Sequence, residues 1–166
     1  MIIGIHPMRY NTIRLVCFLL LLVFLPSSHA TAGVYVTLEG FEVDKMASIW
    51  LIQRFIDQEA KFKFVAKGDK LPAGERFDMP ESSLRRTATQ STYEVLLSHY
   101  TIKDKLLRYI GKIIHDIEIN TWERKRLAQT HEVQLMIGSI IQDADNNEKK
   151  IERSTSYFDR LYNSLL

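Results

Sequence analysis

The chain has 166 residues, a formal net charge of +2 and a single cysteine, Cys17. Residues 1–30 contain two of the 22 basic residues and none of the 20 acidic residues, so the rest of the chain is formally neutral. A neutral chain lacks the basic surface of nucleic-acid-binding proteins, and we therefore expect no nucleic-acid partner. Without residues 1–30 no cysteine remains, which excludes disulfides, thiolate metal ligands and a cysteine nucleophile.

The first thirty residues have the organisation of an export signal, because two arginines precede the apolar residues 15–25. As a helix this run would span roughly 16 Å, about half of the ~30 Å hydrocarbon core, which disfavours a lasting membrane span. Small residues provide cleavage sites near Ala30 or Ala32. We expect residues 1–30 to be a signal peptide, with an uncleaved anchor or a buried helix as the alternative. Residues 31–166 then form a single domain that is periplasmic or extracellular and meets the membrane only during export.

Two strand patterns flank a helix at the start of this domain. Residues 34–41 have an alternating pattern that includes β-branched side chains, which predicts a strand. Residues 61–66 alternate charged with apolar side chains and predict a second, half-exposed strand. Between them, residues 45–56 predict a mostly buried helix that begins at Asp44 as its N-cap and carries Trp50 into the core. We expect the two strands to share a parallel or mixed sheet, with this helix as the right-handed crossover connection.

After Pro80 the hydrophobic pattern becomes helical. Helices are expected over residues 92–100, 103–119, 131–143 and 148–164, with no further strand. The predicted fold class is therefore α+β: a small N-terminal mixed sheet with a crossover helix, followed by a predominantly helical C-terminal half.

Three motifs resemble the domain of chromate-resistance protein B and its exported relatives. They are residues 44–57, residues 77–80 together with 91–94, and residues 115–118. The likeness covers about residues 41–124. It implies membership of this family's exported branch and a context of chromate resistance.

The chain also departs from the pattern of the regulator-type members of this family. Those members carry a Cys-Pro pair where this chain has Ser48 and Ile49, a second cysteine where it has Ser91, and a histidine near the position of Ala88. They also have a DNA-binding domain where this chain has the expected signal peptide. The resemblance therefore implies an exported domain without thiol chemistry and without the regulatory role.

The helix expected over residues 103–119 carries the candidate metal ligands. Its helical spacing places His115 opposite the apolar face and puts Glu118 on the same side as His115. We expect a divalent metal ion with nitrogen and oxygen ligands from His115, Asp116 and Glu118. Folding would have to add Glu94, with Asp44 or Asp78 as the alternatives. The alternative is a polar pair, His115 and Glu118, that binds nothing.

Four other residues are candidate ligand-binding residues: Asp44, Lys45, Arg54 and Asp78. Arg54 lies on the polar strip of a mostly buried helix, so we expect a carboxylate partner from among Asp57, Asp78 and Glu94, with anion binding as the alternative. Arg85 and Arg86 could meet an oxyanion, although two arginines in a loop usually form solvated surface.

The function favoured by these residues is that of an exported domain that binds a metal ion or an oxyanion. One alternative is a metal-dependent enzyme in which His115 is a ligand or general base. The other is a degenerate structural or interaction module, which the residues Ser48, Ser91 and Ala88 favour. Protein partners stay open at this level.

Overall fold

The computed structural model describes residues 33–166, so the expected export signal lies outside the described residues. The strands β1 (Val34–Leu38) and β2 (Lys61–Val65) form as the alternating sequence predicts. A third strand, β3 (Glu75–Arg76), is not predicted, because two residues are too few to show an alternating pattern. The three strands form one sheet in the order β2-β1-β3.

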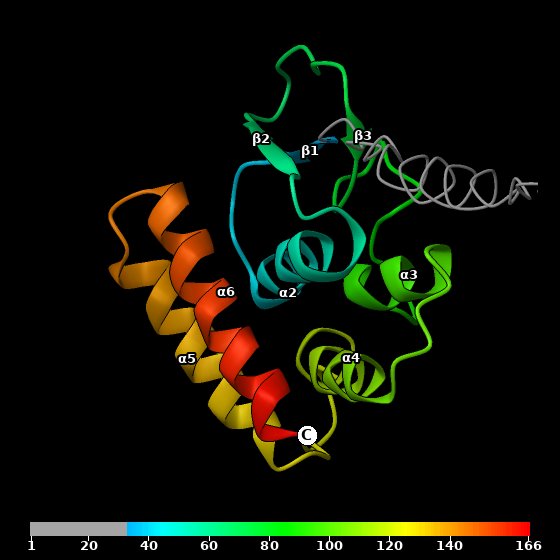
Figure 1. Cartoon of the computed structure of the whole chain (residues 1–166), viewed down its shortest axis with the longest axis vertical. Coiled ribbons are helices and arrows are strands. Elements are labelled where there is room, and N and C mark those ends of the chain that lie inside the picture. The colour runs from blue at the N-terminus through cyan, green and yellow to red at the C-terminus, as the bar shows by residue number, and fades with distance from the viewer. Residues whose placement is uncertain (1–32) are drawn as a thin grey trace, which may run out of the picture. The chain divides into compact units, whose positions relative to one another are not determined.

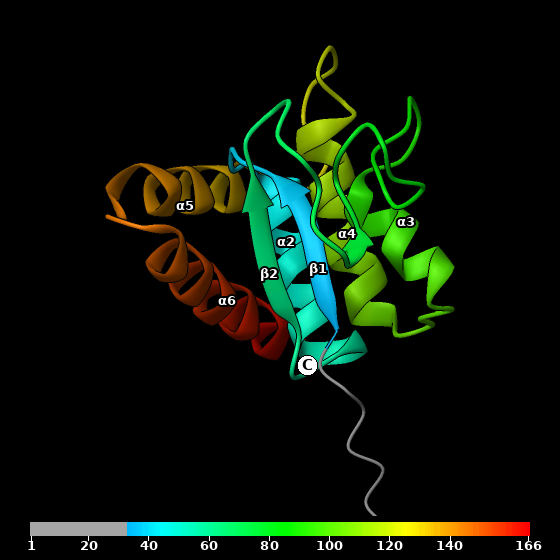
Figure 2. The same cartoon turned by 90° about the horizontal axis from the view of Figure 1, so that it is seen from above.

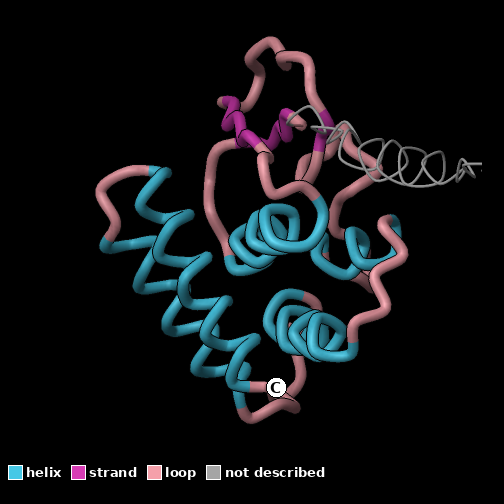
Figure 3. The backbone as a smooth tube through the Cα atoms, in the orientation of Figure 1, coloured by secondary structure: helices cyan, strands magenta, loops and turns pink. Residues whose placement is uncertain are grey.

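The sheet is parallel, one of the two arrangements, parallel or mixed, that the sequence predicts: β1 pairs in parallel with both of its neighbours. A helical connection between β1 and β2 permits this direction, which a tight hairpin would not. The register sets Tyr35 beside Phe62 and Thr37 beside Phe64, so that these side chains share one face of the sheet. The rings of Tyr35 and Phe62 stack with their centroids 5.8 Å apart. Figure 3 shows the helices gathered on one side of the strands.

Helix α2 (Val43–Leu51) lies between the sheet and the other helices (Figure 1). All nine of its residues are buried, which confirms the predicted buried helix. The helix continues into a π-helical segment, η1 (Ile52–Ile56), so the helical region ends at the predicted residue.

The C-terminal half is helical, and each helix boundary agrees with the predicted one within two residues. The helices are α3 (Thr92–His99), α4 (Lys105–Glu118), α5 (Gln129–Asp143) and α6 (Asn147–Ser164). Figure 1 shows α3 and α4 on one side of α2, and α5 and α6 paired on the other. The α+β class is confirmed. Within residues 33–166, no helix is both long and apolar enough to cross a membrane.

Trp50 links α2 to α6 in the core. Its side chain is buried, and its ring stacks on that of Phe158 with centroids 5.4 Å apart and an interplanar angle of 27°. The prediction that Trp50 is a core residue is confirmed. Because β2 is an outer strand in the order β2-β1-β3, it keeps one free edge, which Figure 2 shows beside α6.

Candidate functional site

Helix α3 begins with a capping box that fixes the position of Glu94. The Ser91 hydroxyl accepts the N–H of Glu94 at 3.2 Å, and Glu94 Oε2 accepts the N–H of Ser91 at 2.9 Å. Each residue therefore satisfies a backbone donor that the start of a helix leaves free. The Glu94 carboxylate is held beside the helix start and faces α4.

Asp44 caps a different helix from the one that the sequence predicts. The N-cap residue of α2 is Glu42, whose own side chain makes no capping hydrogen bond. The fully buried Asp44 carboxylate instead accepts the N–H groups of Thr92 at 2.7 Å and Tyr93 at 2.9 Å, in the first turn of α3. Burial raises the pKa of Asp44 to about 7, although these two hydrogen bonds oppose the increase. The predicted cap therefore joins two helices that are distant in sequence.

Arg86 lies among three carboxylates and is not the solvated loop residue that its sequence context predicts. Its Nη2 lies 2.5 Å from Glu42 Oε1 and 3.1 Å from Glu118 Oε2, and its Nε lies 3.7 Å from Asp44 Oδ2. Glu118 also accepts the N–H of Asp44 at 3.3 Å. Burial raises the pKa of Glu118, as does Glu42, while Arg86 lowers it. Arg85, one residue earlier, is exposed as predicted.

Lys45 and Asp78 form a buried brace next to Asp44. The Lys45 ammonium donates to the carbonyl oxygens of Leu38 and Gly40, both at 2.7 Å, and lies 3.6 Å from Asp78 Oδ2. The other oxygen of Asp78 accepts the Thr92 hydroxyl at 2.7 Å. Burial raises the pKa of Asp78, although the hydrogen bond from Thr92 and the charge of Lys45 oppose this increase. Three of the four predicted ligand-binding residues, Asp44, Lys45 and Asp78, therefore lie together with their polar atoms already bonded within the protein.

The fourth predicted ligand-binding residue, Arg54, lies elsewhere. Its partner is Asp159 of α6, with Nη2 to Oδ2 at 2.8 Å and Nε to Oδ1 at 3.0 Å, and not Asp57, Asp78 or Glu94 as predicted. The indole N–H of Trp50 donates to the same carboxylate at 2.8 Å. Arg54 therefore joins η1 to α6 and takes no part in the candidate site.

His115 and Glu94 meet, as predicted for two of the four metal candidates. His115 Nδ1 lies 2.9 Å from Glu94 Oε2. An ionised carboxylate only accepts hydrogen bonds, so Nδ1 is assigned as the donor to Glu94, and Nε2 has no hydrogen-bond partner within residues 33–166. The His115 side chain is 38% exposed.

A cavity of about 490 Å³ opens beside His115. It is lined by Glu94, Lys112, His115, Asp116, Ile119, Asn120, Glu123, Arg126 and Leu127. Lys112 stands one helical turn before His115 on α4, and within residues 33–166 its ammonium forms no hydrogen bond or ion pair. Arg126 is paired with Glu123 at the exposed rim.

Asp116 shapes the wall of this cavity through the loop that follows α4. Its Oδ2 accepts the Arg126 N–H and the Thr130 hydroxyl, both at 2.7 Å, and the Leu127 N–H at 3.2 Å, while Oδ1 accepts the Asn120 amide at 2.7 Å. Burial opposes ionisation, but these bonds outweigh it and lower the pKa of Asp116 to about 2. Asp116 is therefore ionised, and its oxygens are used to hold the loop.

The four predicted metal ligands are consequently divided. Glu94 and His115 form a pair, Glu118 belongs to the Arg86 cluster, and Asp116 holds the loop. Across residues 33–166, no group of three or more His, Cys, Asp or Glu side chains is placed to hold a metal ion.

Sequence reasoning missed three features of this site. The Ser-x-x-Glu spacing of Ser91 and Glu94 is the signature of a capping box, and the three-residue spacing of Lys112 and His115 indicates a shared helix face. Both spacings are local and can be recognised in the sequence. The position of Arg86 had no local signal, because its partners are 32 or more residues away in the chain.

Most of the described chain matches a known domain type. The family model described as ChrB, C-terminal domain, matches residues 35–165. The chain is also similar to Protein ChrB of Cupriavidus metallidurans, with 30% identity over 87 residues. That match covers 51% of this chain but 27% of the relative, so the chain spans about a quarter of the relative's length. No solved structure matches the chain.

Proposed function

Because the chain belongs to the ChrB C-terminal domain family, we propose that it is a binding domain that takes a small oxyanion in the cavity beside His115. Chromate is the first candidate, since the resemblance of the three motifs implies a context of chromate resistance. The observation that carries the proposal is that the carboxylates around the cavity have hydrogen-bond or ion-pair partners, while within residues 33–166 the Lys112 ammonium has none and His115 is bonded through Nδ1 alone.

The acidic side chains of the cavity have hydrogen-bond or ion-pair partners within the protein. Asp116 accepts four hydrogen bonds, and Glu94 Oε2 accepts from Ser91 and His115. Glu123 is paired with Arg126. These partners reduce the repulsion that carboxylates would exert on an entering anion.

The cationic side chains can supply the donors that an oxyanion needs. Lys112 and His115 line the same cavity from neighbouring turns of α4, and Arg126, which is paired with Glu123, lines it from the loop. A protonated His115 would donate from Nε2 while Nδ1 stays on Glu94, and the Lys112 ammonium offers three donors. Hydrogen bonds of this kind between charged partners are the stronger ones.

Replacing Lys112 by glutamine, or His115 by alanine, should weaken chromate binding by about tenfold each, because each change removes one charge-assisted donor. Isothermal titration of the full chain with chromate at low ionic strength measures this loss, and sulfate should compete because it has the same tetrahedral shape and charge. The Lys105→Gln variant is the matched control, since Lys105 lies on α4 but does not line the cavity. Equal affinity of all variants, or no binding of either anion, would contradict oxyanion binding here.

The contact between His115 Nδ1 and Glu94 favours a second candidate function, in which Nε2 is a metal ligand or a general base. A carboxylate on the far nitrogen orients the imidazole in both kinds of site. A metal ion would rely on water for most of its coordination, because the described chain brings no three candidate ligands together. Binding of Zn²⁺ or Mn²⁺ that the His115→Ala change abolishes, in a chain that binds no chromate, would support this candidate. A chain that binds neither would leave the structural module as the remaining function.

We also propose export of the domain, on the basis of residues 1–30. Expression in a Gram-negative host should yield a periplasmic protein whose first residue is Thr31 or Gly33. These two starts follow from cleavage after Ala30 or after Ala32, where small residues provide sites for a signal peptidase. Cell fractionation and intact mass measure the location and the cleavage site. Substituting arginine for Leu20 should block export by breaking the apolar run. A full-length cytoplasmic product from the unmodified chain would exclude the proposal.

The neutral charge of residues 31–166 supports the absence of a nucleic-acid partner.

A further inference from the structure

The outer strand β2 has a free edge. The sheet order β2-β1-β3 leaves β2 paired on one side only. Lys61 donates its N–H to Gly33 at 2.9 Å, and the Val65 carbonyl accepts from Glu39 at 2.9 Å, so these residues point their backbone groups toward β1. Alternate residues of a strand point the other way. The N–H and C=O groups of Phe62 and Phe64 therefore face the free edge.

A groove runs beside this edge, between β2 and α6. Its volume is about 680 Å³. Phe62 and Phe64 line it from the strand, while Glu148, Ile151 and Glu152 line it from successive turns of α6. The Arg54–Asp159 pair also lines it, and Figure 2 shows α6 extending beside the edge strand. Such a groove, between an unpaired strand and a helix, has the form in which an extended peptide adds a strand to a sheet.

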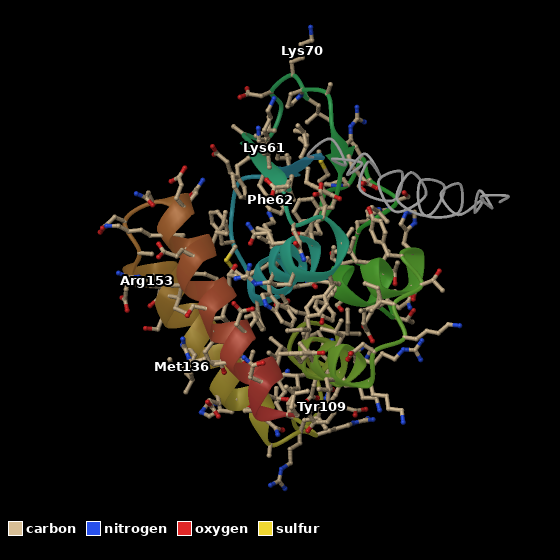
Figure 4. The ribbon with its side chains drawn as sticks, in the orientation of Figure 1. Lys61, Phe62, Lys70, Tyr109, Met136 and Arg153 are labelled. Carbon is tan, nitrogen blue, oxygen red and sulfur yellow. The ribbon has the colours of Figure 1, made fainter. Side chains whose placement is uncertain are left out.

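The two faces of the edge carry opposite charges. Glu148 and Glu152 are exposed on the groove side, and within residues 33–166 neither forms an ion pair. Lys61 and Lys63 are exposed on the opposite face of the sheet, because their side chains alternate with those of Phe62 and Phe64. Figure 4 shows Phe62 on the helical side of β2 and Lys61 on the other.

We infer that the groove between β2 and α6 binds an extended peptide segment of a partner protein that pairs with the edge of β2. The side chains of an added strand alternate between the two faces. Those entering the groove meet Glu148, Glu152 and the phenylalanine rings, and are basic or apolar. Those on the other face meet Lys61 and Lys63, and are acidic. The partner segment is therefore one in which acidic residues alternate with basic or apolar residues.

A second copy of this chain does not meet these requirements. Pairing of two β2 edges would place Lys61 and Lys63 of one copy near the same lysines of the other, and like charges across strands are destabilising. Edge lysines of this kind disfavour self-pairing, whereas a partner strand with acidic residues removes the repulsion.

The test uses the full chain and a synthetic peptide of about seven residues, enough to span the five residues of β2. Glutamate occupies alternate positions of the peptide, with lysine and valine between them. On binding, hydrogen exchange of the Phe62 and Phe64 amides should slow by about tenfold or more, while that of the Lys61 and Lys63 amides, already bonded toward β1, should not change. A peptide of the same composition with its glutamates clustered should bind at least about tenfold more weakly.

Charge reversal tests the two faces separately. Glu152→Lys and Lys63→Glu should each weaken binding of the alternating peptide by about fivefold or more, because each places a charge opposite a peptide side chain of the same sign. Glu132→Lys is the matched control, since Glu132 is exposed on α5 and does not line the groove. A peptide with glutamate and lysine exchanged should bind the Lys63→Glu/Glu152→Lys double variant better than it binds the unmodified chain.

Three results would overturn the inference. The first is equal binding of the alternating and clustered peptides, or binding without slower exchange at Phe62 and Phe64. The second is slow exchange at these amides that increases with protein concentration in the absence of peptide, which would identify a second copy as the occupant. The third is slow exchange at every concentration without peptide, which would show that the chain fills its own groove.

Discussion

Replacing Asp44 by alanine should lower the free energy of unfolding by about 2–4 kcal/mol, because it leaves two buried backbone donors without an acceptor. The N–H groups of Thr92 and Tyr93 are the donors that Asp44 satisfies, and both residues are fully buried. The change also removes the connection between α2 and α3. Urea unfolding followed by circular dichroism at neutral pH measures the loss.

Asp69→Ala is the matched control for this change. Asp69 is exposed in the turn after β2, where its backbone N–H, and not its side chain, forms the turn hydrogen bond to Ala66. The control should change the free energy of unfolding by less than about 0.5 kcal/mol. A loss below about 1 kcal/mol for Asp44→Ala would show that water or another group satisfies the two amides.

The Asp44 carboxyl group also makes the free energy of unfolding depend on pH. Burial raises the pKa of Asp44 from its ordinary 3.8 to about 7, so between these values the folded chain holds a proton that the unfolded chain has lost. Stability contributed by this group is therefore greatest below pH 3.8 and falls as the pH rises toward about 7. Relative to the Asp44→Asn variant, which cannot ionise here, the unmodified chain should lose stability over this interval and show no further relative loss above it. A constant difference between the two would contradict the raised pKa.

Replacing Arg86 by glutamine should destabilise the fold by about 2–3 kcal/mol near pH 8, because it leaves several carboxylates without their common counter-charge. Asp44 is fully buried and Glu118 has 12% of its side chain exposed, so neither can turn fully to water. Glu42 is 47% exposed and can be solvated, which keeps the expected loss below that of a completely buried pair. Urea unfolding measures the difference.

Arg85 provides the control for Arg86 because the same substitution can be made one residue away. Arg85→Gln should have little effect, since Arg85 is exposed and forms no ion pair within residues 33–166. The Arg86→Gln/Glu118→Gln double variant should regain part of the lost free energy of unfolding, because it removes one of the carboxylates left without a counter-charge. The penalty of Arg86→Gln should also shrink at about pH 5, where the stranded carboxylates take up protons. Equal effects of the Arg85 and Arg86 changes would exclude the proposed role of Arg86.

The elements that the sequence predicts well are those defined by local pattern. The alternation in β1 and β2 and the helical spacing in α3 to α6 depend on neighbouring residues, so their positions agree closely with the structure. β3 escapes prediction because it consists of two exposed residues that form a strand only by pairing with Tyr35 and Val36. Its existence depends on the rest of the fold.

The site is predicted less completely, because its geometry depends on contacts between distant parts of the chain. The pairing of Glu94 with His115 could be expected from chemistry, but Asp44 reaches a helix 48 residues away and Arg54 meets a partner 105 residues away. A cap or an ion pair within one element has a spacing that can be recognised. Neither residue shows such a spacing, so the sequence assigned Asp44 to the wrong helix and Arg54 to the wrong partners.

The stacking of Trp50 on Phe158 constrains the order in which the chain can complete its fold. Trp50 belongs to the first helix of the described chain, whereas Phe158 and Asp159, which hold its ring and its N–H, belong to the last. A chain emerging from a ribosome or a translocation pore from its N-terminus exposes the indole until α6 has followed. Closure of the core is therefore a late, long-range event, and a chain truncated before residue 158 would present an apolar surface to chaperones and proteases.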